Sequence, residues 1–281
     1  MSFHKIKSYA KINLILNITG KDFLLHKIES IIMFTALHDE IFIKTIKSNN
    51  HYISFFGKFS AGINMNNTVT KLLNILENKG LLKDKKFRIK INKKIPNRAG
   101  LGGGSMNAAN ILRYLIKKKI VKANKKEISE ICKLIGSDVI LGLNSNNSIL
   151  TSKDEIKYFK NTQKFNILII RPNFGCSTKK IYSYVNKFNK PKLNNPNKKM
   201  FETEFLIKNY NFLELFAFSR YPKLEILKIY MERELRPTFV RMTGSGSAIV
   251  AYYKSKKKCE NAKKKFTKKY KNFWCIASKT I

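Results

Sequence analysis

The stretch IPNRAGLGGGSMNAANIL, residues 95–112, places four of the chain's thirteen glycines within positions 100–104. Three of these glycines are consecutive, and glycine loses more conformational freedom on folding than any other residue. A chain that carries them either uses the stretch as a flexible connection or brings another group close to its backbone. The residues on both sides of the glycines decide between these two interpretations.

The flanks are patterned as a strand and a helix. Before the glycines, Phe87, Ile89 and Ile91 alternate with polar residues, which is the period of a half-buried strand. After the glycines, apolar residues recur with the 3.6-residue period of a helix, at Ala108, Ile111, Leu112, Leu115 and Ile116. This order presents free backbone N–H groups and the positive end of a helix dipole to an anion. Phosphate binding is therefore favoured over a hinge.

The loop matches neither common phosphate fingerprint in full. It lacks the GK[ST] of a Walker loop, and Ser105 stands where the third glycine of GxGxxG would fall. Ser105 is predicted either to cap the helix or to reach a metal ion bound to the phosphates.

Elsewhere, apolar periodicity predicts a mixture of strands and helices. We predict strands over 8–20, 28–34, 39–46, 85–96, 165–172, 248–253 and 273–278, and helices over 68–80, 125–136 and 259–270. The polar stretch 144–154 predicts a loop, and we place a domain boundary there, which divides the chain into 1–152 and 153–281. The Asn-, Lys- and Pro-rich stretch 187–199 predicts a mobile surface loop. This order implies the α+β class with two domains.

The chain carries 56 Lys and Arg residues against 18 Asp and Glu, a formal net charge of +38. Such an excess is typical of proteins that bind polyanions. The basic residues are mostly lysine and are spread along the chain, whereas the reading of bases and phosphates usually enriches arginine. We therefore predict a lysine-biased surface that attracts an anionic small molecule, and no nucleic-acid partner. A basic RNA-binding protein is the alternative.

No apolar run approaches the ~20 residues that cross a membrane, and the first residues lack the apolar core of a signal peptide. We expect a cytoplasmic location and no membrane partner. The four cysteines are scattered, and the four histidines form no HxxxH pattern. Neither a disulfide framework nor a metal site built from protein ligands is predicted.

Three further features place polar chemistry in apolar surroundings. Lys11 and Asn13 share one face of the first predicted strand, whose apolar sequence indicates a central position. A lysine there would stabilise a transferring phosphoryl group or acidify a neighbouring hydroxyl. Asp138 is flanked by apolar runs and is either a helix N-cap or a carboxylate that acts as a base or orients a hydroxyl. The stretch MTGSGSA, residues 242–248, taken alone predicts a turn, and its glycines and hydroxyls would also allow it to contact an anion or pack against the first glycine loop.

Three motifs in this order resemble those of the GHMP kinases: AKINL at 10–14, IPNRAGLGGGSMNAA at 95–109 and MTGSGSA at 242–248. Within that superfamily, IGSDVI (135–140), STKKIY (177–182) and NFLE (211–214) are most similar to signatures of the 4-diphosphocytidyl-2-C-methyl-D-erythritol kinases. The matches run from Ala10 to Ala248 and are specific as a set. The resemblance implies a ribosomal-protein-S5-like N-terminal domain and a ferredoxin-like C-terminal domain.

The resemblance also implies an activity of the non-mevalonate isoprenoid pathway, ATP-dependent phosphorylation of the 2-hydroxyl of a cytidine diphosphate derivative of methylerythritol. Lys11 and Asp138 match the catalytic positions. The ATP-binding positions are Pro96, Ala99, Gly100, Leu101, Gly102, Gly103, Gly104 and Ser105. The substrate-binding positions are Asn13, His26, Thr178, Tyr182, Gly244 and Ser245, with Tyr182 stacking on the cytosine ring. Mg²⁺ would bridge the ATP phosphates without a dedicated set of protein ligands, and a monomer or weak homodimer is expected.

The chain departs from the family pattern in several places, and the segment GKDFLLHKI, residues 20–28, is one residue shorter than the family's and lacks its Asp-Gly turn. Leu25 and Ile32 stand where the family has aromatic residues, and Ile140 replaces a proline after Asp138 and Val139. Altered cytidine recognition, or a homoserine- or mevalonate-type kinase of the same superfamily, therefore remains an alternative. A chain that keeps the fold for interaction only is disfavoured, because Lys11, Asp138 and the glycine loop are all intact.

Overall fold

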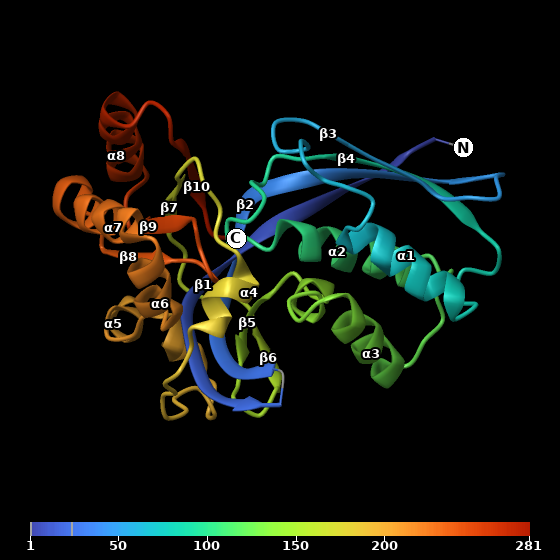
Figure 1. Ribbon diagram of the computed structural model, residues 1–281, viewed down its shortest axis with the longest axis horizontal. Coiled ribbons are helices and arrows are strands. Elements are labelled where there is room, and N and C mark those ends of the chain that lie inside the picture. The colour runs from blue at the N-terminus through green and yellow to red at the C-terminus, as the bar shows by residue number, and fades with distance from the viewer. Residues whose placement is uncertain (1, 24) are drawn as a thin grey trace. The chain divides into compact units, whose positions relative to one another are not determined.

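Strands and helices are interspersed along the chain in the computed structural model, which describes residues 2–23 and 25–281 (Figure 1). The strands are β1 (His4–Asp22), β2 (Leu25–Ile46), β3 (Tyr52–Phe56), β4 (Lys86–Asn92), β5 (Asn147–Leu150), β6 (Ile156–Phe159), β7 (Asn166–Arg171), β8 (Phe239–Met242), β9 (Ile249–Tyr253) and β10 (Trp274–Lys279). The helices are α1 (Thr68–Asn78), α2 (Gly103–Lys117), α3 (Lys125–Ile135), α4 (Thr178–Ser183), α5 (Thr203–Ile207), α6 (Leu213–Arg220), α7 (Pro222–Leu235) and α8 (Lys256–Lys269), with the 3₁₀ turns η1 (Ile140–Leu143) and η2 (Lys198–Phe201). The predicted α+β class is confirmed.

Contacts within the chain divide it into two compact units, and neither is one continuous stretch. Unit 1 holds the chain up to Ala10, Leu37–Asn97 and Gly102–Ser145. Unit 2 holds Lys11–Ala36, Arg98–Leu101 and Asn146–Ile281. β1 and β2 therefore each contribute residues to both units. The domain boundary after residue 152 stays a prediction, because these interleaved units do not correspond to a single cut in the chain.

In unit 1, the C-terminal half of β2 pairs antiparallel with β4, and β3 pairs parallel with the other edge of β4. The side chains of β4 alternate between buried and more exposed positions, as its sequence predicts. Phe87, Ile89 and Ile91 are the buried set, and they share one core with apolar residues of α1, α2 and α3. These helices cover one face of the strands (Figure 1).

The helices of unit 1 begin and end where local signals place them. The Asn67 side chain accepts the N–H groups of the first turn of α1. α3 opens with a reciprocal capping box between Asn124 and Glu127, and it ends at Gly136. The helices predicted over 68–80 and 125–136 are confirmed.

In unit 2, four strands form an antiparallel sheet in the order β10, β7, β9, β8. α6, α7 and α8 share a core with this sheet that includes Leu168, Ile249 and Phe266, and Figure 1 shows α7 and α8 beside its strands. The N-terminal half of β2 pairs with β5, which pairs with β6. The strands and the helix predicted for the C-terminal part of the chain are confirmed.

Two predictions about where strands begin and end are wrong. The strands predicted over 28–34 and 39–46 are one strand, β2, because the residues between them include no Gly, Pro or Asn to turn the chain. The predicted loop over 144–154 contains β5. Its polar residue Asn147 is tolerated in a buried strand because it accepts the N–H of Phe34 at 3.2 Å and donates to Thr162 Oγ1 at 2.9 Å.

The first strand is buried without being central. In the sheet that the described residues form, β1 pairs with β2 and with no other named strand. Irregular chain of unit 2 covers its other edge: Lys11 N–H donates to Leu101 O at 3.1 Å, and the backbone of Leu16 bonds to Tyr210 and Phe212. The prediction of a central strand is therefore wrong, because an apolar sequence reports burial and not strand order.

The cysteines serve the cores. Cys132, Cys176 and Cys259 are buried, and burial raises the pKa of each thiol to about 11, so the thiols stay protonated. Within residues 2–23 and 25–281, no group of three or more His, Cys, Asp or Glu side chains is placed to hold a metal ion. None of the helices described combines the length and the apolar character that a membrane crossing needs.

Candidate active site

The glycine loop enters α2 at Gly102. Gly102 is the N-cap, in the left-handed conformation at φ 68°, and no described side chain caps the helix. The first turn also contains no acidic residue, so its N–H groups keep their capacity for an anion. Ser105 is the third residue of α2, and the alternative that Ser105 caps the helix is wrong. A glycine at the cap permits the φ that the turn requires, which serine adopts only with strain.

Asp39 contacts the chain on both sides of this loop. The sequence analysis missed this residue. Its carboxylate is fully buried, and Oδ1 accepts the backbone N–H groups of Lys94 and Ile95, each at 2.8 Å. Oδ2 pairs with the buried ammonium of Lys93 and accepts from Asn107 Nδ2 at 3.0 Å. The carboxylate thereby ties the end of β4 to the first two turns of α2. The available signal was an acidic residue in the apolar run ALHDEIFI, which no motif singles out.

Close packing leaves little room at the consecutive glycines. A Cβ added to Gly103 would lie 3.0 Å from Ile95 Cγ2 and 3.2 Å from Lys93 Nζ. Gly104 is exposed, and its carbonyl accepts a hydrogen bond from Thr68 Oγ1 at 2.7 Å. The loop is therefore held by defined contacts on both sides, which supports a preorganised anion cradle over a flexible connection.

Asp138 lies in the turn between α3 and η1 and is half-buried. Val139, and not Asp138, is the N-cap of η1, so the helix-cap alternative is wrong. The turn is fixed against α2 because η1 approaches it closely: a Cβ on Gly142 would lie 2.6 Å from Ala109 Cβ and 2.9 Å from Met106 Sδ. A half-buried carboxylate on a rigid turn can accept a proton or orient a hydroxyl group.

In unit 2, Lys11 begins a chain of hydrogen bonds. The Lys11 side chain is 3% exposed, and its Nζ donates to Asn13 Oδ1 at 2.8 Å. Asn13 Nδ2 donates to Ser30 Oγ at 2.8 Å, and Ser30 Oγ donates to the carbonyl of Ile15 at 2.5 Å. This chain sets which end of the Asn13 amide faces the ammonium group. Ser30 was missed by the sequence analysis, because it stands in β2 outside every motif.

The second glycine loop packs against the first, as one of the two sequence alternatives predicts. Thr243 Oγ1 accepts the N–H of Asn13 at 3.0 Å and donates to Gly100 O at 3.1 Å. A Cβ on Gly100, whose φ is 72°, would lie 1.9 Å from Thr243 O. Any side chain at Gly100 would therefore separate the loops. Ser245 is buried and shares a 2.9 Å hydrogen bond with Thr178 Oγ1, and Gly244 is buried as well.

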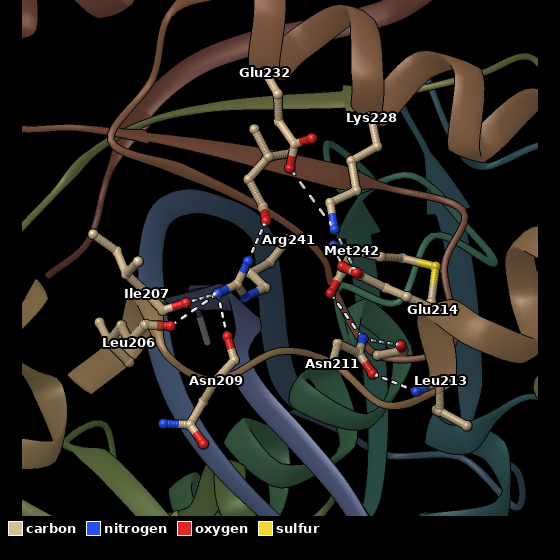
Figure 2. Close-up of polar contacts among 12 residues, drawn as sticks. Leu206, Ile207, Asn209, Asn211, Leu213, Glu214, Lys228, Glu232, Arg241 and Met242 are labelled. Carbon is tan, nitrogen blue, oxygen red and sulfur yellow. Dashed lines mark hydrogen bonds and ion pairs between the residues drawn. The ribbon is translucent and has the colours of Figure 1, made fainter. Parts of the chain in front are cut away.

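Two residues of the NFLE stretch hold the start of the second loop (Figure 2). Asn211 Nδ2 donates to the carbonyls of Met242 and Gly244 at 2.8 and 2.7 Å. Glu214 Oε1 accepts the N–H of Met242 at 2.7 Å, and its other oxygen pairs with Lys228 at 2.7 Å. The sequence motif thus marks structural supports of the loop.

Arg241 of β8 binds the segment that runs from the end of α5 toward Asn211. Its guanidinium donates to the carbonyls of Leu206 and Ile207, at 2.8 and 3.3 Å, and to that of Asn209 (Figure 2). A planar group with several donors is suited to collecting carbonyls at the end of a helix. Arg241 therefore closes the end of α5 and fixes the approach of the chain to Asn211.

His26 and Tyr182 form a separate aromatic cluster in unit 2. Their ring centroids lie 5.2 Å apart, and Phe188, which the sequence analysis missed, lies 6.4 Å from His26. His26 Nε2 is buried without a hydrogen-bond partner among the described residues. Burial, and then the charge of Lys21, lowers the pKa of His26 from its usual 6.5, so the imidazole is neutral at pH 7. A neutral imidazole can donate or accept one hydrogen bond at a ligand's edge.

The remaining predicted residues are located as follows. Pro96, Ala99 and Leu101 are buried, so the backbone and not the side chains would face a ligand there. Unit 2 brings Lys11, Asn13, Gly100, Gly244 and Ser245 together through the contacts above, while unit 1 carries Gly102–Ser105 and Asp138. Leu25 belongs to β2, but its side chain lies outside the described part of the structure. Ile32 is fully buried.

Comparison with known proteins shows the family to which the chain belongs. Residues 67–148 match the family profile of the GHMP kinases N terminal domain. The chain is 52% identical over all 281 residues, and over the whole of the other protein, to the 4-diphosphocytidyl-2-C-methyl-D-erythritol kinase of Pelagibacter ubique (strain HTCC1062). The chain belongs to this kinase family. It is also 32% identical over 256 residues to the same kinase of Petrotoga mobilis (strain DSM 10674 / SJ95), covering 87% of this chain and 96% of the other.

Solved structures share the fold over the full length. The structure of a 4-(cytidine 5'-diphospho)-2C-methyl-D-erythritol kinase aligns with a TM-score of 0.78 at 21% identity, covering 99% of this chain and 100% of the other. The mevalonate kinase of Methanococcus jannaschii aligns with a TM-score of 0.66 at 16% identity, covering 100% and 99%. The two-domain GHMP kinase fold is therefore confirmed.

Proposed function

We propose that this chain transfers the γ-phosphoryl group of ATP to the 2-hydroxyl of 4-diphosphocytidyl-2-C-methyl-D-erythritol. The observation that carries the proposal is the uncapped start of α2 behind Gly102, in a chain 52% identical over its length to a kinase of that name. The homoserine- and mevalonate-type alternatives are less well supported, because the full-length sequence relationship is to the cytidyl kinase.

The glycine loop fits the triphosphate of ATP. The N–H groups at the start of α2 are not taken by a side-chain cap, so they can bind an anion. The glycines let the loop pack tightly on Ile95, Lys93 and Thr68, which holds these N–H groups in place. Gly102–Ser105 would hold the phosphates, with Gly100 and Leu101 shaping the loop before them. Because the described residues offer no three-ligand metal cluster, Mg²⁺ would be held mainly by phosphate oxygens, with the Ser105 hydroxyl as a candidate ligand. When bound, it would neutralise phosphate charge.

Lys11 and Asp138 are the proposed catalytic residues. The Lys11 ammonium, oriented by Asn13, supplies positive charge for the transferring phosphoryl group or for the developing alkoxide. Asp138 accepts the hydroxyl proton or orients the hydroxyl group. His26 and Tyr182 are proposed to bind the cytosine ring, with the neutral imidazole at its polar edge and Tyr182 on its face.

We infer a small-molecule partner, a cytoplasmic location and a monomer or weak homodimer. RNA binding is the rival function, since the net charge is +38. An RNA-binding protein would show tight affinity for any RNA with a steep salt dependence. A salt titration of RNA binding, run beside ATP binding on the same preparation, separates the two.

The decisive experiment measures ADP formation by the purified protein with Mg-ATP and the cytidyl substrate. Wild type should form ADP, and Asp138→Asn should lower kcat by about 100-fold or more, because the asparagine amide cannot accept the proton. Asp154→Asn, in an exposed turn, is the matched control and should leave kcat unchanged. Turnover of homoserine or mevalonate in place of the cytidyl substrate would keep the kinase class and overturn the proposed acceptor.

A further inference from the structure

Residues 186–193, here called the strap, run between α4 and η2 without any helix or strand. Most of the strap belongs to the stretch 187–199, for which the sequence predicts a mobile surface loop. The strap carries Phe188, which is 48% exposed, beside His26. Because the strap has no backbone hydrogen bonds of a helix or strand, its position depends on contacts with the rest of unit 2.

Glu29 of β2 makes the main contact with the strap. Its carboxylate is fully buried, a position that a charged group occupies only when donors surround it. Oε1 accepts the backbone N–H of Lys192 at 2.8 Å, and Oε2 accepts that of Leu193 at 3.0 Å. Asn17 Nδ2 supplies a third donor at 2.9 Å. Two of the three described donors to Glu29 therefore come from the strap itself.

Asn17 adds hydrogen bonds to the strap close to Phe188. Its Oδ1 accepts from Asn189 Nδ2 at 2.7 Å, and its Nδ2 also reaches Lys190 O at 3.3 Å. The backbone N–H of Asn189 donates to Ile18 O at 2.8 Å. Asn189 is the residue directly after Phe188, so the backbone that carries this ring is fixed to β1.

The energetics favour a docked strap. If the strap left its place, the Glu29 carboxylate would lose two of its three described donors, and an underbonded carboxylate is unfavourable until water replaces them. Bonds from N–H groups to a carboxylate are also stronger than bonds between neutral groups. The side chain of Leu193 is buried and adds apolar contact to the same end of the strap.

We propose that Glu29 is a positioning residue that clamps the strap on β1 and β2, and that the clamp sets Phe188 as a recognition surface for the planar ring of the phosphoryl acceptor. His26 lies beside both Tyr182 and Phe188, and its Nε2 is buried without a hydrogen-bond partner among the described residues. Holding a ring in place before binding removes the entropy loss of ordering it. The identity of the acceptor rests on the proposed function, whereas the clamp does not.

Hydrogen exchange of backbone amides and proteolysis test the clamp without an activity assay. In Glu29→Gln, an amide N–H₂ replaces one acceptor oxygen, so one strap N–H loses its partner. We expect faster hydrogen exchange at the amides of Lys192 and Leu193, and faster trypsin cleavage of the bond between these two residues. Glu155→Gln, at an exposed glutamate of the same unit, is the control. Unchanged exchange and cleavage in Glu29→Gln would overturn the clamp.

Binding and kinetics test the recognition role. We expect Glu29→Gln and Phe188→Ala each to weaken binding of cytidine diphosphate and to raise KM for the acceptor, by roughly fivefold to tenfold, with KM for ATP unchanged. The two changes should be non-additive, because both act through the position of one ring. Equal changes in both KM values, or full additivity, would show that Glu29 has a general structural role.

A second variant covers the case in which Glu29→Gln fails to fold. Asn189→Ala removes the side-chain bond to Asn17 and leaves the buried carboxylate untouched, so it should give the same loosening in weaker form. If wild type neither turns over the cytidyl substrate nor binds cytidine diphosphate, the recognition role and the proposed acceptor both fail, and the exchange result still decides the clamp.

Discussion

Asp39 and Glu29 are both fully buried carboxylates, and each holds an irregular segment next to a part of the candidate site. They differ in their partners. Asp39, in unit 1, pairs with the buried ammonium of Lys93 and accepts two backbone N–H groups beside the glycine loop. The donors described around Glu29, in unit 2, are neutral: the Asn17 amide and two backbone N–H groups of the strap.

The difference shows how a buried acid can be used in two ways. The Asp39–Lys93 pair has no net charge, so it can support the loop proposed for the phosphates without adding net charge there. Glu29 brings a buried charge whose only described compensation is hydrogen bonds, which makes its environment depend on the strap. Neutralising each acid should therefore have unequal consequences, and the predictions below proceed from the largest expected effect to the smallest.

Asp39→Asn should give the largest loss, about 3 kcal/mol in the free energy of unfolding, because Lys93 is left buried without a counter-ion. Urea unfolding measures the loss. Adding Lys93→Met should recover about 1–2 kcal/mol of it, since the uncompensated charge is then removed as well. A loss for Asp39→Asn no greater than that for Glu29→Gln would contradict the distinction between the two anchors.

Glu29→Gln should lower the free energy of unfolding by only about 1 kcal/mol. The change removes a buried charge, which is favourable, and spoils one hydrogen bond to the strap, which is unfavourable. The same urea titration on the two isosteric variants makes the comparison direct. A loss of 3 kcal/mol or more would mean that the strap is part of the global folding unit and not a locally clamped segment.

The smallest effect concerns one histidine in each unit. Burial, and then a nearby lysine, lowers the pKa of both His26 and His51 from 6.5. The folded state therefore binds a proton less readily than the unfolded state, so stability from this source is complete above pH 6.5 and falls as the pH drops through that value. Unfolding at pH 7.5 and 5.5 should show a weaker pH dependence in His26→Gln and in His51→Gln. Variants that follow the wild-type dependence would refute the linkage.

Much of the fold could be predicted from the sequence, because its signals are local. The alternation in β4, the helical period after Gly102 and the caps at Asn67 and Asn124 each act within a few residues. The glycine loop and the family resemblance are likewise short motifs in a fixed order. One error overlooked a local signal, the absence of Gly, Pro and Asn within residues 35–38, over which β2 continues. The other concerns the edge on which β1 pairs, which is not decided locally.

The candidate site divides in the same way. Lys11, Asp138 and the glycines are visible in motifs, because the chemistry proposed for them needs particular residue types. Their supports are not, since they join residues far apart in the chain: Asn13 to Thr243, and Glu29 to Leu193. A buried aspartate or glutamate has the same letter as an exposed one, and burial is a property of the packed chain.

The sequence by itself determined the α+β class and the family, and it predicted the loop that we propose for the ATP phosphates, because periodicity and glycine content are written residue by residue. Only the tertiary structure decided that Gly102 and not Ser105 caps α2, and that the Asn- and Lys-rich strap is fastened to a buried glutamate. The physical reason is that the free energy of a hydrogen bond or a buried charge depends on what surrounds it, and those surroundings exist only after the chain has folded.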